Sequence, residues 1–201
     1  TLGDSLTFWR VVLKTRGLKT LWGPLAAPES LTVDVTPRRV QHFKPAPGTK
    51  KDRFTFLFVG KFVEKKGLGF LLDAASIVKN EMSGLRLIIV GGGRDEMYYK
   101  DRAAKLGLKE QAEFCGWINN DKVSSLYNES DALIVPSVFD KKGETEGMPV
   151  VILEAMGCGI PVIASRISGI TDVVKDRHNG LLFEPGDINE LAEKMVQMYK
   201  S

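Results

Sequence analysis

The sequence predicts an α/β domain with a doubly wound parallel sheet, occupying residues 48–201 of the 201-residue chain. From Phe54 onward, short apolar runs rich in β-branched residues alternate with segments of helical period, which is the pattern of repeated βαβ units. Several runs are apolar nearly throughout, as expected for parallel strands covered by helices on both faces. Hydrophobic residues make up 43% and charged residues 26% of the chain, which is typical of globular proteins and argues against disorder, coiled coil or fibre.

The pattern predicts six strands and five helices in alternation. The strands are apolar runs that end at glycine, proline or polar residues, and we expect them at 54–60, 85–91, 112–116, 132–136, 161–165 and 180–184. Helices fall between them where apolar residues recur every three or four positions, at 68–79, 96–106, 121–129, 150–156 and 189–199. Right-handed crossovers then place the helices on both faces of one sheet.

Residues 1–47 differ from the rest and are predicted to form an N-terminal stub and an interdomain linker. An amphipathic stretch is followed there by irregular, proline-rich sequence. Residues 1–44 carry seven basic and three acidic side chains, a net charge of +4. The whole chain carries +3, so the rest of the chain carries −1. The compact part has no basic excess, which argues against nucleic-acid binding. The apolar and basic residues of 1–22 suggest either peripheral contact with an anionic membrane or, as we favour, packing against another domain.

The sequence contains no run of roughly 20 apolar residues that could span a bilayer, and its first residues do not have the layout of a secretion signal. We therefore expect a cytoplasmic protein. Any membrane contact would be peripheral, at the inner face. Cys115 and Cys158 stand in apolar surroundings without metal-ligand spacing and are expected to be buried thiols. The sequence contains no Asp-x-Asp, and His42 and His178 are isolated. We therefore expect neither a metal nor a cofactor.

Doubly wound sheets bind ligands beside the carboxyl ends of their strands, so the loops after the strands are the candidate sites. Lys61 and Lys66 follow Gly60 in the first of these loops, where two cations could neutralise a diphosphate. The alternative is that both are solvated surface lysines. The glycines of the next loop, Gly91 to Gly93, precede Arg94 and a predicted helix, and they could let backbone N–H groups approach a phosphate or could simply form a turn that admits the helix.

Two carboxylates flank the start of the helix predicted at 150–156. Glu146 lies in the loop before it and Glu154 within it. Such a pair could hold a hexose at one end and a ribose at the other, with loop N–H groups between them for phosphate. Solvated surface acids are the alternative, but Glu154 stands among apolar neighbours, where an unpartnered carboxylate would be costly.

The stretch from Glu146 to Glu154, followed by Ala-Met-Gly-Cys-Gly-Ile-Pro-Val-Ile-Ala, resembles the signature of glycosyltransferase family 4. Further blocks agree in order and spacing, namely FLFVGKFVEKKGLGFLLDA, LIIVGGG, FCGWI, SDALIVPS and SGITDVVKDRHNGLLFEPGD. The resemblance covers 54–199 nearly continuously. It implies the C-terminal half of a GT-B enzyme, in which this Rossmann-like domain holds the donor. The acceptor would lie mostly on an N-terminal domain that is not part of this chain.

The resemblance also implies a role for each matched position. Glu146 and Lys66 would be the catalytic contacts, Glu146 to hydroxyls of the transferred sugar and Lys66, together with Lys61, to the diphosphate. Lys61 stands where arginine is more usual, which keeps the charge but loses the bidentate fork. Glu154 would bind the ribose. The other donor contacts would come from Gly60, Gly92, Arg94, Trp117, Ile118, Gly147, Met148, Pro149 and Val150.

The implied function is transfer of a sugar from a UDP- or GDP-linked donor to a glycan or lipid-linked acceptor, with retention of anomeric configuration, in polysaccharide or glycoconjugate biosynthesis. One alternative is a nucleotide-sugar-binding module without transfer activity. Another is a different GT-B enzyme, such as a sugar-nucleotide epimerase or a glycogen synthase. A nicotinamide-dependent enzyme is disfavoured because no Gly-x-Gly-x-x-Gly follows a predicted strand.

Overall fold

A computed structural model describes residues 43–45, 53–167 and 169–201 of the chain. The predicted N-terminal stub and its possible membrane contact lie outside the described residues, as does the expected domain boundary near residue 48. The expected compact domain is described almost completely.

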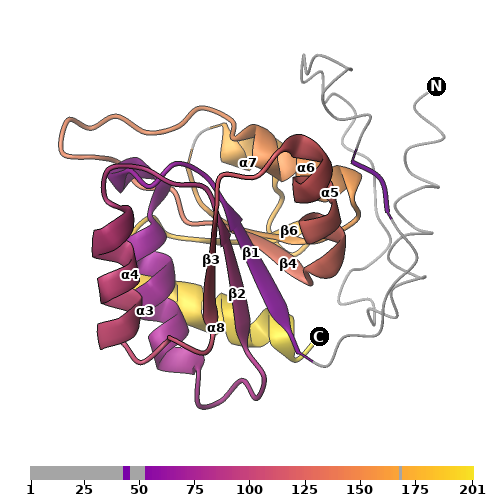
Figure 1. The fold of residues 1–201 in the computed structure, drawn as a ribbon. Helices are drawn as coiled ribbons and strands as arrows, with labels where there is room; N and C mark the ends of the chain where they lie inside the picture. Colours follow the sequence, from indigo (N-terminus) through magenta and orange to yellow (C-terminus); the bar gives the residue numbers. More distant parts are fainter. Residues whose placement is uncertain (1–42, 46–52, 168) are drawn as a thin grey trace, which may run out of the picture.

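Six parallel strands form one sheet, in the order β3-β2-β1-β4-β5-β6 (Figure 1). In chain order they are β1 Thr55–Val59, β2 Arg86–Val90, β3 Ala112–Gly116, β4 Ala132–Val135, β5 Val162–Ser165 and β6 Gly180–Phe183. All six predicted strands are confirmed, with ends within one residue of the expected ones. The chain reverses its direction of travel across the sheet between β1 and β4, and ligands of such sheets bind beside the carboxyl ends at this switch point.

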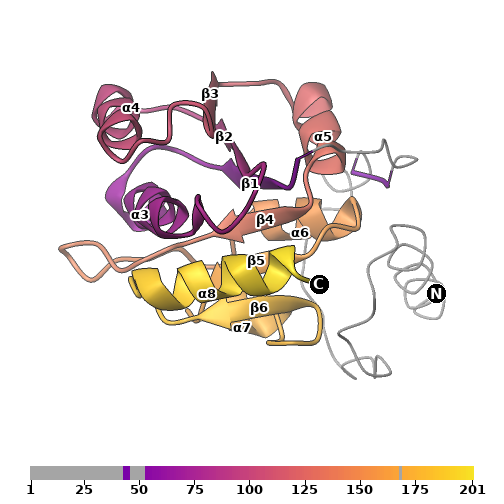
Figure 2. The same cartoon turned by 90° about the horizontal axis from the view of Figure 1, so that it is seen from below.

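Helices cover both faces of the sheet (Figures 1 and 2), which confirms the doubly wound fold. One face carries α3 Leu68–Val78, α4 Glu96–Lys105 and α8 Ile188–Tyr199, and the other carries α5 Asn120–Glu129, α6 Val150–Gly157 and α7 Ile170–Val173. The two faces of β1 show why: Phe56 and Phe58 belong to the first apolar cluster, and Leu57 to the second. Alternate side chains of a strand point to opposite faces, so an all-apolar strand requires helices on both.

All five predicted helices are confirmed within one residue at each end. Two short elements were not predicted: the 3-10 helix η1 Glu64–Lys66 and the single-turn helix α7. Neither is long enough for apolar residues to recur at helical spacing, so periodicity cannot reveal them. No helix within the described ranges is long and apolar enough to cross a membrane.

Residues 43–45 pack on the domain although most of the linker lies outside the described residues. Phe43 is only 4% exposed and belongs to the cluster under α5 and α6. Its ring meets the Tyr127 ring edge-on, with centroids 5.4 Å apart. The side-chain amide of Asn128 donates a hydrogen bond to the Lys44 carbonyl at 3.0 Å. The chain is therefore fixed to α5 before it enters β1.

Candidate functional site

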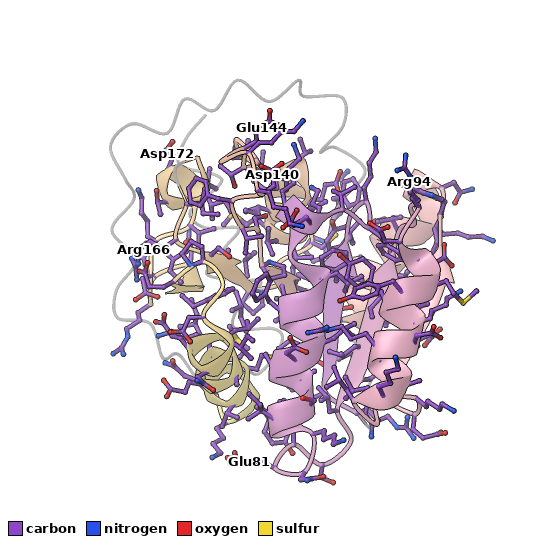
Figure 3. All side chains as sticks on the ribbon, turned by 90° about the vertical axis from the view of Figure 1, so that its left-hand side faces the viewer. Glu81, Arg94, Asp140, Glu144, Arg166 and Asp172 are labelled. Atoms are coloured by element: carbon purple, nitrogen blue, oxygen red, sulfur yellow. The ribbon has the colours of Figure 1, made fainter. Side chains whose placement is uncertain are left out.

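The loops that carry the predicted site residues share the carboxyl edge of the sheet, because all six strands run parallel. Figure 3 shows Arg94, Asp140 and Glu144 at one end of the molecule, with Glu81, which lies between α3 and β2, at the opposite end. The loops after β2 and β4 therefore lie at the same end of the molecule.

The loops after β1 and β2 are joined at their glycines. Gly91 has φ +128°, and a Cβ on it would lie 1.8 Å from the Gly60 carbonyl oxygen, so no other residue fits without moving backbone. Gly60 itself leaves room for the stem of Lys66, whose Cδ would be 3.3 Å from a Cβ at position 60. These two glycines bring backbone and a lysine stem close together at the end of β1.

Lys66 and Glu146 meet from loops that follow different strands. The Lys66 Nζ lies 2.6 Å from both carboxylate oxygens of Glu146, and the two side chains are 19% and 15% exposed. The hydroxyl of the buried Ser137 donates to Glu146 Oε2 across a longer 3.4 Å. Desolvation offsets much of the attraction in a partly buried pair, so its value for stability is small. Its importance is that a cation and a carboxylate are held at the switch point.

The approach of these two loops depends on Gly67, the residue between η1 and α3. Gly67 has φ +68°, and a Cβ there would lie 1.7 Å from the Pro136 carbonyl oxygen. The Val138 N–H also donates to the Lys65 carbonyl at 3.0 Å. The segment after β1 is thereby pinned to the segment after β4, and Lys66 is placed opposite Glu146.

Glu146 differs from the other acids of its loop. Asp140 closes a turn, since its carboxylate accepts from the N–H groups of Lys142 and Glu144, both at 2.9 Å. Glu144 is exposed. Only Glu146, among these three acids, is mostly covered and paired with a lysine, so the interpretation of Glu146 as a solvated loop acid is wrong.

Glu154 is buried, as its apolar neighbours predicted, with 5% of its surface exposed. It is the fifth residue of α6, and its Oε2 accepts a hydrogen bond of 2.9 Å from the Tyr127 hydroxyl on α5. The same hydroxyl lies 3.4 Å from the Val151 carbonyl oxygen. The buried carboxylate is thus partnered, which is what burial of a charge requires.

The N-terminus of α6 completes this part of the edge. The helix begins at Val150 after Pro149, with no side-chain cap, and the Ile152 N–H donates to the Pro149 carbonyl, so the N–H groups of Val150 and Val151 are the ones that could bind an anion. Gly147 is exposed and Met148 is half-buried. A Cβ on Gly169, after β5, would lie 2.9 Å from the Gly147 carbonyl, so the β5 loop packs against 147–148. Gly169 belongs to the block SGITDVVKDRHNGLLFEPGD, which supported the family resemblance, but its contact with Gly147 could not be predicted from the sequence.

The remaining predicted side chains make no contact with the ion pair of Lys66 and Glu146 among the interactions that the structure describes. Lys61 and Arg94 are exposed. Trp117 is 68% exposed, and its indole Nε1 would lie 2.8 Å from a Cβ at Gly92, so it lies against the β2 loop. Ile118 packs against the cluster under α5 and α6. Lys66 is paired with Glu146, whereas Lys61 is exposed, so convergence of the two lysines on a diphosphate stays a prediction.

Two residues that contact the predicted carboxylates were missed from the sequence, Tyr127 and Ser137. Tyr127 is an inward position of an amphipathic helix, where an aromatic residue is ordinarily a core residue. Ser137 ends the block SDALIVPS, and its proximity to Glu146 depends on the path of the loop. Among the described residues no three His, Cys, Asp or Glu side chains are grouped as metal ligands would be. The absence of a metal requirement stays a prediction.

Comparison with known proteins places the chain in a family. The profile of the family described as glycosyl transferases group 1 matches residues 40–201. The amylovoran biosynthesis glycosyltransferase AmsK of Erwinia amylovora is 31% identical over 142 residues, covering 71% of this chain and 35% of AmsK. A GDP-mannose-dependent phosphatidylinositol monomannoside mannosyltransferase of Mycobacterium tuberculosis is 25% identical over 205 residues, covering 97% of this chain and 52% of the mannosyltransferase.

The solved structures include HepE of Anabaena in complex with UDP. It aligns with a TM-score of 0.65 and 26% identity, covering 74% of this chain and 40% of HepE. The chain thus spans about a third to a half of the length of the proteins it matches. The match to the family profile extends over most of the chain and over every strand of the sheet. The chain therefore belongs to the group 1 glycosyl transferases, and its doubly wound sheet is the fold of a GT-B glycosyltransferase domain.

Proposed function

We propose that this chain is the donor-binding domain of a retaining glycosyltransferase whose donor is a UDP- or GDP-sugar. The observation that carries the proposal is the meeting of Lys66 and Glu146 at 2.6 Å beside the switch point, at the edge where α6 begins. A cation, a carboxylate and free helix N–H groups are the three kinds of group that a diphosphate-linked sugar needs. The acceptor, a glycan or lipid-linked sugar, would bind to a second domain.

The chemistry follows from where charge develops. When the bond between the anomeric carbon and the diphosphate oxygen breaks, negative charge grows on the leaving diphosphate. Lys66 and the first N–H groups of α6 would stabilise it, with the exposed Lys61 able to approach, so we propose that no metal is needed. The oxygen of the acceptor hydroxyl would bond to the anomeric carbon on the same face of the sugar, and its proton would pass to the leaving diphosphate oxygen, so the configuration would be retained.

The two carboxylates would hold the donor at its two ends. Glu146 would accept hydrogen bonds from hydroxyls of the transferred sugar, and in doing so would release part of its hold on Lys66. Glu154 would accept from the ribose. HepE, which binds UDP, and the mannosyltransferase, which depends on GDP-mannose, support a nucleotide-sugar donor and leave both bases open. AmsK, which acts in amylovoran biosynthesis, supports a role in polysaccharide assembly.

A thermal-shift screen of this chain against UDP-, GDP- and ADP-sugars tests the proposal. A ligand at 100 times its dissociation constant stabilises a folded protein by about 2.7 kcal/mol, which is readily measured. One base should stabilise the chain, and Lys66→Gln should weaken that stabilisation. Lys65→Gln is the matched control, since Lys65 is the neighbouring lysine of η1 and is not placed in the site.

Two outcomes would contradict the proposal. If no nucleotide-sugar shifts the melting temperature, the chain does not bind donor. If donor binds but the full-length protein transfers no sugar to any glycan or lipid-linked acceptor, the chain is a binding module or serves another GT-B reaction, such as epimerisation, which product analysis would reveal.

A further inference from the structure

Tyr127 is a fully buried residue whose hydroxyl contacts Glu154, a proposed ligand of the donor. It is 0% exposed, and its hydroxyl lies 2.9 Å from Glu154 Oε2 and 3.4 Å from the Val151 carbonyl oxygen. A hydroxyl has one proton to donate, and the nearer, charged acceptor makes the stronger hydrogen bond. The phenol therefore donates to Glu154 and fixes one oxygen of that carboxylate.

Phe43 packs against the ring that carries this hydroxyl. The two rings meet edge-on at 88°, with centroids 5.4 Å apart, and Asn128 on the same helix donates to the Lys44 carbonyl. Phe43, Tyr127 and Glu154 thus form a buried series that starts in the segment preceding β1 and ends on α6. The hydroxyl cannot turn away from Glu154 without moving a packed ring.

The orientation of Glu154 matters because so little of it is exposed. A side chain that is 5% exposed offers only a small part of its surface to a ligand. Whether that part is a carboxylate oxygen depends on how the side chain is rotated. A carboxylate has about four lone-pair sites, so the bond from Tyr127 leaves acceptor capacity for ligand hydroxyls.

We propose that Tyr127 is a positioning residue for the donor nucleotide, holding Glu154 so that the carboxylate accepts from the ribose hydroxyls. This inference rests on the proposed function, because it takes Glu154 as the ribose ligand. It goes beyond that function by assigning the Tyr127 hydroxyl as the group that orients Glu154, and Phe43 as the residue that holds the Tyr127 ring in place. Tyr127 makes ribose recognition dependent on the packing of the segment that precedes β1.

The test compares nucleotides that differ only in the hydroxyls that Glu154 would bind. UDP, GDP and their 2′,3′-dideoxy counterparts are titrated calorimetrically into this chain. Tyr127→Phe should lower the affinity of the preferred ribonucleotide about tenfold, which corresponds to 1.4 kcal/mol, and should leave that of the dideoxy form unchanged. Tyr199→Phe is the control, since it removes another phenol hydroxyl, 3.5 Å from the Ser83 carbonyl oxygen, and should change neither.

The outcomes separate this inference from the proposed function. If the wild-type chain binds neither UDP nor GDP, the proposed function fails. If it binds both forms of the nucleotide equally, Glu154 is not a ribose ligand and the inference fails with it. If Tyr127→Phe weakens both forms equally, the residue is merely structural. In a Glu154→Ala background, Tyr127→Phe should cause no further loss of ribose preference, because the hydroxyl then has nothing to position.

A second measurement does not depend on any variant. In a crystal structure of the wild-type chain with the preferred ribonucleotide, the Tyr127 hydroxyl should stay within hydrogen-bond distance of Glu154 while that carboxylate contacts the ribose. A ribose bound elsewhere, or a Glu154 side chain turned away from Tyr127, would overturn the inference.

Discussion

Lys66 and Glu146 lie 80 residues apart in the chain, and the Lys66 ammonium is 2.6 Å from both oxygens of the Glu146 carboxylate. Each is a proposed donor ligand. Without donor, Glu146 stands where the diphosphate would contact Lys66, and Lys66 stands where the sugar hydroxyls would contact Glu146. On the proposed function, donor binding would require an exchange, in which the diphosphate binds Lys66 and the sugar hydroxyls bind Glu146 in place of their ion pair. That exchange makes the two halves of the donor separable by mutation.

Glu146→Gln should have opposite effects on the two halves of the donor. The variant frees Lys66 from its ion pair, so the affinity for a nucleoside diphosphate should stay equal or rise severalfold. The affinity for the complete nucleotide-sugar should fall about tenfold, because a carboxylate accepts more strongly than an amide. Calorimetry with the nucleoside diphosphate and with the nucleotide-sugar measures the ratio of the two affinities. Glu144→Gln, an exposed acid of the same loop, is the control, and equal behaviour of the two variants would contradict the assignment.

Gly67→Ala should destabilise the domain by more than about 2 kcal/mol, since it adds backbone strain to a clash. The new Cβ would lie 1.7 Å from the Pro136 carbonyl oxygen, at φ +68°. Gly143→Ala is the matched control: its φ is similar, +75°, but nothing lies within 4 Å of the added Cβ. Gly143→Ala should cost only the strain, about 1 kcal/mol. Urea unfolding of both variants measures the two losses of stability. Equal losses would mean that residue 67 does not pack tightly against the Pro136 carbonyl.

Phe43→Ala should destabilise the domain by about 3 kcal/mol, as for other buried phenylalanines. Phe43 is 4% exposed and packs on Tyr127. Phe139→Ala removes the same ring from a side chain that is 56% exposed, and should change stability by no more than about 0.5 kcal/mol. Chemical denaturation measures both. A loss for Phe43→Ala no larger than for Phe139→Ala would mean that the segment before β1 does not pack on α5 in solution.

Cys115 should react slowly with alkylating reagents near neutral pH. The structure leaves this cysteine half-buried, where the sequence predicted a buried thiol. The partial burial raises the pKa of the thiol above the ordinary value of 9.0, and the nearby Glu113 carboxylate raises it further. The folded state then holds the proton more tightly than the unfolded state. The resulting stability is complete below the unfolded pKa and is lost as pH rises through the folded pKa. Iodoacetamide labelling followed by peptide mapping should show slower reaction than for a free cysteine at pH 8, and equally fast reaction would contradict the raised pKa.

The sequence was sufficient for the elements whose signal is local. Every strand is an apolar run of its own, and every helix of eight residues or more shows apolar periodicity, so their ends were predicted within one residue. Helix α7 and η1 were not predicted because one turn is shorter than the period that would reveal it. Burial of Glu154 could be predicted, because its immediate neighbours in the chain are apolar.

What the sequence could not supply is the set of partners that the fold brings together. Tyr127 lies 27 residues before Glu154 on a different helix, and only the packing of α5 against α6 makes them neighbours. Lys61 and Lys66 are close in sequence and were expected to act together. The turn through η1 directs Lys66 to Glu146, while Lys61 remains exposed.

A crystal structure of this chain with a bound nucleoside diphosphate tests the central claim most directly. The account predicts the diphosphate between Lys66 and the first N–H groups of α6, with the ribose at Glu154. A nucleotide bound away from the carboxyl edge of the sheet, or one that leaves the Lys66 and Glu146 ion pair intact and contacts neither residue, would contradict it.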